Sequence, residues 1–350
     1  MGVQAETPDI KAEPAETRVI QESSQDLWLR RAKTLAPVWT LLVLWLVFSF
    51  ATTSFATATN FNNILARIAV PGILAVGMTF VLLTGEIDLS IAPVMALSAE
   101  IATQLHATYH LPEPIPIIAG LLTGILCGVG SGVISTVIRV PTFMATLAMQ
   151  LIAQGLLLWI SQGRSFYTES LSPWIVWIGS TKLGGDDGLR SGVMILLSAM
   201  CLLIGYLVLR YTRFGRYVFM TGANPAAARL AGINTKLMVF SVLTICGFTA
   251  GLAGLVATGR LGAAGSAPEP GYLIDAIAVV VLGGTSLTGG RGGMWQSAVG
   301  LLIYGSLSNG LDNIANIPGL AKTLITGLVL LAALVVNIVF AGRAARDRTG

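Results

Sequence analysis

Long apolar runs separated by short polar segments make up most of this chain. Because about 20 consecutive apolar residues cross the hydrocarbon core of a bilayer, such runs are candidate transmembrane helices. The pattern predicts ten of them, at residues 37–55, 64–84, 91–105, 115–138, 141–160, 193–209, 237–258, 274–287, 294–311 and 320–340. The predicted fold is therefore an all-α, polytopic membrane protein with its transmembrane domain at residues 35–342.

Composition supports this fold class. The 350 residues are 54% hydrophobic and only 11% charged, whereas a soluble domain carries about 25% charged residues. The formal net charge is +4, and no basic stripe interleaved with aromatic residues is present, which argues against nucleic-acid binding. The three cysteines, Cys127, Cys201 and Cys246, lie in apolar runs without disulfide or metal-ligand spacing, so we expect no metal site.

The polar segments predict two tails and two long loops. Residues 1–34 are rich in acidic side chains and predict a disordered cytoplasmic tail, and residues 343–350 predict a short basic one. The long loops lie at about 163–190 and 211–236. Trp174 and Trp177 in the first of these loops are typical of a membrane interface.

Basic residues predict the side of the membrane on which each loop lies, because cytoplasmic loops carry an excess of Lys and Arg. With ten spans and both termini in the cytoplasm, 15 of the 21 Lys and Arg residues fall on the cytoplasmic side. Arg67, at the predicted edge of its span, counts among the remainder. This orientation places residues 211–236 in the cytoplasm and residues 163–190 outside.

The loop at 211–236 contains a short segment with its own helix signals. Asn224 is a good N-cap, because its side-chain oxygen can accept a backbone N–H, and Pro225 suits the first helical position. Gly232 stands where a left-handed C-cap is expected. These signals predict a helix of about seven residues, which is marginal alone and needs a partner to pack on. The pattern by itself fits a capped turn between two membrane helices equally well.

Three motifs stand out along the chain. They are Gly-x-Asn-x-x-Ala-Ala-x-x-x-Gly-Ile at 222–233, Gly-Glu-Ile-Asp-Leu-Ser at 85–90, and the glycine cluster at 283–293. Together they resemble the permease subunits of ribose/xylose-type ABC importers, over roughly residues 35–340. In that family the first motif docks on the ATPase subunit and transmits its closure to the membrane helices. The resemblance implies this coupling role for Gly222, Asn224, Pro225, Ala227, Ala228, Arg229 and Gly232.

The same resemblance implies the partners and the substrate class. An ABC ATPase subunit would carry ATP and Mg, with no cofactor on this chain, and an extracytoplasmic sugar-binding protein would deliver the substrate. A second copy of the chain, or a paralogue, would complete the pathway in the cytoplasmic membrane of a prokaryote. The chain would not be an enzyme. Glu86 replaces the glycine that the family usually has there, which looks more like the xylose-type branch, so a pentose such as xylose or ribose is expected.

Polar groups and glycines next to the spans are candidates for the translocation path or gate. An ionisable group at membrane depth is costly unless it is paired or faces water. Asp88 has a second interpretation, as the N-cap of the following helix, and Arg291 could pair with Glu86 or Asp88. The glycine cluster lacks the Gly-Lys-Ser/Thr of a phosphate loop and predicts a tight turn instead. The candidates are Glu86, Asp88, Ser90, Gly283, Gly284 and Ser286.

Three weaker patterns complete the sequence reading. Glycines at every fourth position from 120 to 132 predict close helix packing. Asp275 and Asp312 near span ends either meet a binding protein through salt bridges or are solvated loop charges. Val-Pro-Thr-Phe at 140–143 and Ile-Pro-Gly-Leu at 317–320 each open the last span of one half, which suggests a five-plus-five repeat.

Three other functional classes are weighed against the sugar importer. A branched-chain amino-acid ABC permease has a similar coupling loop, although Asn224 and the Ile-Asp-Leu-Ser motif favour sugar. An ion-coupled secondary transporter would use buried carboxylates as proton relays, whereas the carboxylates here cluster at span ends. An intramembrane enzyme would need a catalytic motif such as His-Glu-x-x-His or Gly-x-Ser-x-Gly, and neither is present.

Overall fold

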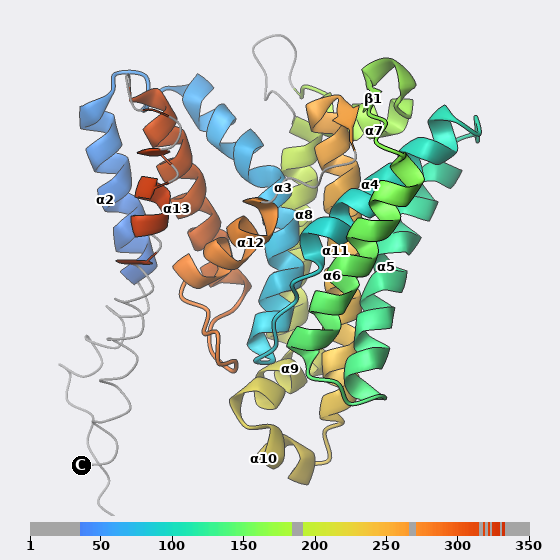
Figure 1. Ribbon diagram of the computed structural model, residues 1–350. Coiled ribbons are helices and arrows are strands. Elements are labelled where there is room, and N and C mark those ends of the chain that lie inside the picture. The colour runs from blue at the N-terminus through green and yellow to red at the C-terminus, as the bar shows by residue number, and fades with distance from the viewer. Residues whose placement is uncertain are drawn as a thin grey trace, which may run out of the picture. The chain divides into compact units, whose positions relative to one another are not determined.

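Figure 1 shows a computed structural model of the chain, which describes residues 36–183, 192–265, 271–314, 318, 321–322, 324–329 and 331–332. Within these residues the only strands are β1 (Phe166–Tyr167) and β2 (Ala263–Ala264), which pair antiparallel. The predicted all-α class is therefore confirmed for this part of the chain, apart from one two-residue ladder. The helices are α2 (Ala36–Ala51), α3 (Ala58–Leu83), α4 (Ile91–Ala107), α5 (Ile115–Thr136), α6 (Thr142–Ser161), the 3-10 helix η1 (Thr168–Ser170), α7 (Pro173–Ser180), α8 (Gly192–Tyr211), α9 (Arg213–Ala223), α10 (Pro225–Leu230), α11 (Thr235–Leu261), α12 (Gly271–Leu282) and α13 (Met294–Asn313).

Each predicted apolar run between residues 37 and 311 contains a helix. By length and composition, α3, α5, α6, α8 and α11 can cross a membrane, and α2 and α12 are shorter apolar helices. This set is that of a polytopic membrane protein. In the predicted run at 320–340, the residues that are described are helical. The predicted tails at 1–34 and 343–350 lie outside the described residues.

Helices α3 and α11 form the centre of the packed core. Helix α11 packs against α3, α4, α5 and α7. Helix α3 is buried without interruption from Ile68 to Leu83. A helix that is apolar all round is expected in the middle of a bundle.

The predicted glycine stripe packs α5 against α11. A Cβ atom added to Gly124 would lie 2.9 Å from the backbone nitrogen of Gly251, and one added to Gly128 would lie 3.0 Å from the Cα of Thr244. Small residues every fourth position allow two helix backbones to approach this closely. The stripe therefore serves packing within the chain, as predicted.

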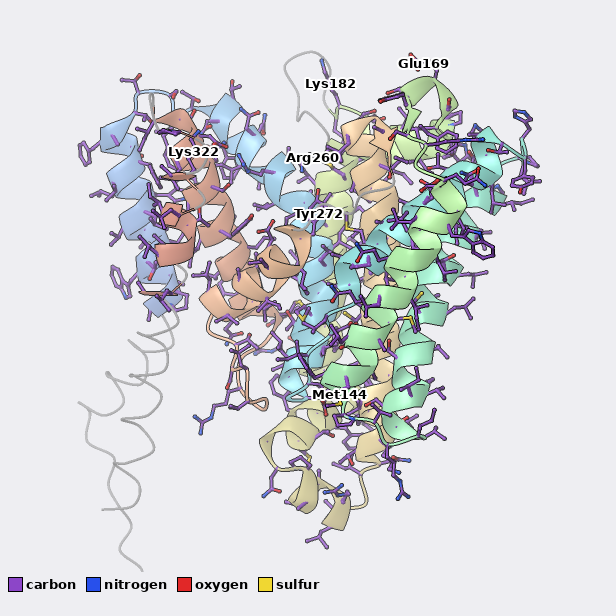
Figure 2. All side chains as sticks on the ribbon, in the orientation of Figure 1. Met144, Glu169, Lys182, Arg260, Tyr272 and Lys322 are labelled. Atoms are coloured by element: carbon purple, nitrogen blue, oxygen red, sulfur yellow. The ribbon has the colours of Figure 1, made fainter. Side chains whose placement is uncertain are left out.

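The loop predicted at 163–190 contains structure that the sequence pattern missed. Its described part holds β1, η1 and α7, and the Ser172 side chain caps α7 by accepting from the Ile175 N–H at 3.3 Å. Trp174 and Trp177 on α7 are 52% and 56% exposed. This segment and the α9–α10 segment lie at opposite ends of the long helices in Figure 1, and Glu169 in Figure 2 marks the end that carries β1 and α7.

The loop predicted at 211–236 contains two helices instead of one. Helix α9 begins after Thr212, whose side chain accepts from the Gly215 N–H at 3.2 Å. Helix α10 follows directly and has six residues, slightly shorter than predicted. The sequence reading missed α9, although Thr212 is an N-cap signal of the same kind as Asn224.

Candidate functional site

Helix α10 begins with the predicted cap. Asn224 is extended, with φ −159° and ψ 97°, and its Oδ1 accepts from the backbone N–H of Ala226 at 3.1 Å and of Ala227 at 3.0 Å. Pro225 takes the first helical position, where no N–H is needed. Asn224 therefore satisfies two of the N–H groups that a helix start leaves without a partner.

The same helix ends in a Schellman motif. Gly232 has φ +81° and donates to the carbonyl of Arg229 at 3.0 Å, while the N–H of Ile233 donates to the carbonyl of Ala228 at 3.0 Å. The expected hydrophobic contact is present, because Ala228 and Ile233 belong to one buried cluster with Met238. Both ends of α10 are thus built by residues within the segment itself.

Helix α10 has one buried face and one exposed face. Ala228 is only 1% exposed and packs toward α9 and α11, whereas Leu230 is 91% exposed. Ala227 and Arg229 are exposed as well. The exposed face of α10 is therefore formed by Ala227, Arg229 and Leu230.

The three sequence motifs meet in space beside α10. The N–H of Gly290 in the α12–α13 loop donates to the carbonyl of Leu83 at the end of α3, at 2.9 Å. A Cβ atom on Gly222, in the last turn of α9, would clash with the same carbonyl and lie 2.7 Å from the Gly290 nitrogen. Each motif is recognisable in the sequence, but their contact is not predicted. The one sequence feature that is consistent with this contact is the glycine that each motif contains.

Asp88 is a buried carboxylate with local hydrogen bonds. It is 2% exposed, and its Oδ1 accepts from the backbone N–H of Ser90 at 2.8 Å and from the Ser90 hydroxyl at 2.6 Å. The thiol of Cys246 on α11 lies close to this carboxylate. Ser90, not Asp88, occupies the N-cap position of α4, so the predicted capping by Asp88 is wrong in detail. The carboxylate orders the turn before the helix and does not reach its first free N–H groups.

The other acidic residue of this motif lies in a different environment. Glu86 is partly exposed. Arg291 is exposed, and among the described residues it forms no ion pair with either Glu86 or Asp88. The predicted pairing is therefore wrong. Arg291 instead contributes its backbone carbonyl, which accepts from the Ser286 N–H at 3.0 Å.

The remaining gate candidates shape the α12–α13 loop. Gly283 is buried, and a Cβ there would clash with the backbone carbonyl of Gln296 in α13. Gly284 has φ +98°, a conformation that favours glycine. The Ser286 hydroxyl shares a hydrogen bond with the Thr288 hydroxyl at 2.8 Å. These contacts give the loop a defined shape, in agreement with the predicted tight turn.

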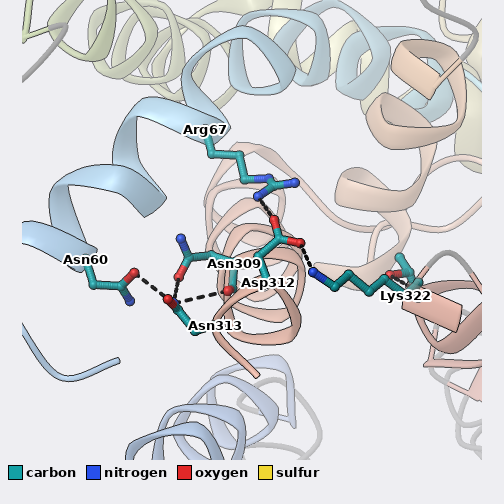
Figure 3. A network of polar contacts seen from close by, with 7 residues as sticks. Asn60, Arg67, Asn309, Asp312, Asn313 and Lys322 are labelled. Carbon is teal, nitrogen blue, oxygen red and sulfur yellow. Dashed lines mark hydrogen bonds and ion pairs between the residues drawn. The ribbon is translucent and has the colours of Figure 1, made fainter. Parts of the chain in front are cut away.

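A polar network at the opposite end of the molecule was not predicted (Figure 3). Asp312 pairs with Arg67 on α3 and with Lys322, whose Nζ lies 2.9 Å from Oδ1. Asp312 is thus engaged within the chain, in neither of the two ways considered for it from the sequence. Arg67 lies within α3, which starts at Ala58, so the helix extends before the predicted start of the span at Ile64.

Amide side chains extend this network. The Asn313 Nδ2 donates to the Oδ1 atoms of Asn60 and Asn309, each at 2.9 Å. Asn60 is also tied to the start of its own helix, because its Nδ2 donates to the Phe55 carbonyl at 2.9 Å. The start of α3 and the end of α13 are therefore linked by hydrogen bonds.

Comparisons with known proteins match almost the whole chain. The family described as "Branched-chain amino acid transport system / permease component" matches residues 60–334. The chain is 36% identical over 313 residues to the ribose import permease protein RbsC of Escherichia coli (strain K12), covering 89% of this chain and 94% of that protein. It is 35% identical over 303 residues to RbsC of Bacillus subtilis (strain 168), covering 87% and 92%. It is 29% identical to the xylose transport system permease protein XylH of Escherichia coli (strain K12), covering 84% and 88%.

Proposed function

The chain belongs to the permease family of branched-chain amino acid transport systems, and from this premise we propose that it is the membrane subunit of an ATP-driven sugar importer. The observation that carries this proposal is the similarity to ribose import permeases over most of both chains. The substrate we propose is a monosaccharide, a pentose such as ribose or xylose. The chain is a transport subunit and not an enzyme, and it carries no cofactor of its own.

Helix α10 is the proposed contact with the ATPase subunit, which binds ATP and Mg. Its two built ends and its exposed face at Ala227, Arg229 and Leu230 support this role. The helix is too short to be stable without its caps and its packing. Closure of the ATPase dimer would push α10, and the attached helices would move with it. A sugar-binding protein on the outer side would deliver the substrate.

The proposed arrangement in the membrane is ten spans in a five-plus-five repeat, with both termini in the cytoplasm. The bias of Lys and Arg toward one side supports this orientation. Two copies of the chain, or this chain and a paralogue, would line one path through the cytoplasmic membrane. Glu86, Asp88, Ser90, Gly283, Gly284 and Ser286 are the proposed path or gate residues.

A branched-chain amino acid is the second candidate substrate, because the matching family is described by that class. The test is to purify the tagged chain in mild detergent, identify the proteins that accompany it, and reconstitute the complex with its binding protein into liposomes. We expect a stoichiometric ATPase subunit and ATP-dependent uptake of labelled ribose or xylose. Uptake of leucine would move the assignment to the second candidate. A lone chain without ATPase activity, with uptake abolished by an uncoupler, would refute the importer.

A further inference from the structure

Three backbone segments that are distant in the sequence touch beside α10. A Cβ atom added to Gly289 would lie 2.8 Å from the backbone nitrogen of Gly85 and 3.1 Å from the Cα of Gly222. One added to Gly290 would lie 2.5 Å from the Cα of Ala223 and 2.8 Å from its Cβ. We call Gly85, Gly222, Gly289 and Gly290 the glycine junction. It joins the end of α3, the end of α9 and the α12–α13 loop.

This junction is stiff because backbone meets backbone. Packed side chains can change rotamer and absorb a small displacement, but glycines in direct contact have no side chain that could yield. The N–H of Gly290 also bonds to the Leu83 carbonyl at 2.9 Å. Gly85, Gly289 and Gly290 have φ values of +81°, +83° and +70°, which other residues adopt only with strain. Because the three backbones already touch, a push of one segment toward the others is passed on to them.

Each segment of the junction leads directly to another part of the candidate site. Gly222 is two residues before Asn224, the cap of α10. Gly85 is three residues before the buried Asp88 and is followed closely by α4, which starts at Ile91. The loop that holds Gly289 connects α12 with α13. The junction thus lies between α10, the proposed docking helix, and two helix pairs of the membrane domain, α3–α4 and α12–α13.

We propose that Gly222, Gly289 and Gly290 are the positioning residues through which movement of α10 reaches the Asp88 segment and the α12–α13 pair. This proposal rests on the coupling role proposed for α10. It adds a specific route: the force passes from the last turn of α9 through glycine backbone contacts, and side chains carry little of it. A methyl group at the junction separates the three segments and breaks this route.

The test uses matched pairs of glycine-to-alanine variants in the complete transporter. Gly222→Ala adds a methyl group at a helical position where alanine is otherwise favourable, and Gly155→Ala does the same in α6, where nothing lies within 4 Å. Gly289→Ala combines crowding with φ +83°, and Gly163→Ala has φ +74° without a neighbour within 4 Å. The readouts are the amount of assembled complex, ATP hydrolysis, and sugar uptake per ATP hydrolysed.

We expect Gly222→Ala and Gly289→Ala to hydrolyse ATP while uptake per ATP falls roughly tenfold or more, as overpacking of a two-state element predicts. Gly155→Ala and Gly163→Ala keep the wild-type ratio of sugar uptake to ATP hydrolysis. Gly124→Ala, which crowds the α5–α11 contact, lowers the amount of complex and leaves the ratio unchanged. A wild-type ratio of sugar uptake to ATP hydrolysis in Gly222→Ala would overturn the proposal for the junction and leave the proposed function intact. Absence of an ATPase subunit from the wild-type preparation would overturn the proposed function beneath it.

A second measurement leaves the glycines intact, so it stands even where a junction variant does not assemble. Spin labels replace the exposed side chains of Tyr217 on α9, Leu287 in the α12–α13 loop and Trp174 on α7, in a chain whose native cysteines are alanine. On addition of ATP, the distance from residue 217 to residue 287 stays constant, and the distance from residue 217 to residue 174 changes. An equal change in both distances would overturn the junction.

Discussion

The N-cap of α10 offers the sharpest single prediction. Asn224→Ala removes the oxygen that accepts from Ala226 and Ala227, at 3.1 and 3.0 Å. Loss of an N-cap costs about 0.5–2 kcal/mol. Because α10 has only six residues, it has few other helical hydrogen bonds to offset that loss. The equilibrium between the folded and the locally unfolded (open) form of α10 should shift by about 2- to 30-fold toward the open form.

Hydrogen exchange of peptides that cover residues 225–233 measures this shift directly, since exchange follows the population of the open form. Binding of the ATPase subunit should weaken as well, because only folded α10 presents the docking face. The matched control is Asn234→Ala. Asn234 caps α11 by accepting from the Leu237 N–H at 3.0 Å, but that helix has 27 residues and is held by the core.

We expect Asn234→Ala to leave exchange in α10 and binding of the ATPase subunit close to wild type. Two results would refute this reasoning. One is wild-type exchange at residues 225–233 in Asn224→Ala. The other is an equal loss of ATPase binding in the two variants, which would mean that the cap matters only for general stability of the loop.

Three further predictions follow from the same contacts. Gly232→Val forces a β-branched residue to φ +81°, at a cost of roughly 1–2 kcal/mol, so the protein should insert normally but lose uptake per ATP; wild-type uptake would contradict the coupling role. Asp88→Asn keeps an acceptor for Ser90 and should hurt folding only slightly, whereas Asp88→Ala leaves two donors unpaired and should lower stability by about 1–3 kcal/mol. A changed sugar preference in Asp88→Asn at normal protein amounts would assign Asp88 to the path instead. Asp312→Asn breaks partly exposed ion pairs and should change the free energy of unfolding by about 1 kcal/mol or less, measured by thermal unfolding; a larger loss would show that the network holds α3 and α13 together.

Contacts over long sequence distance account for several features that the sequence pattern does not predict. The apolar run predicts only that Arg67 lies near the start of a span, and it gives no sign that Arg67 pairs with Asp312 on α13. The pattern predicts Asp88 as the N-cap of α4, but Ser90 occupies that position and Asp88 accepts from the backbone N–H and the hydroxyl of Ser90. The two interpretations of Asp312 from the sequence, a contact with a binding protein or a solvated loop charge, do not include its pairing with Arg67 and Lys322.

The sequence alone determined the elements whose causes are local. The apolar runs predicted the helices, and the capping of α10 could be predicted because Asn224 and Gly232 act on backbone groups no more than a few positions away. The glycine junction could only be decided by the tertiary structure. Gly85, Gly222 and Gly290 are separated by more than sixty residues, and no periodicity in the chain records which backbones will touch. Close approach is a property of packed helices, and glycine in the sequence permits such an approach without naming its partner.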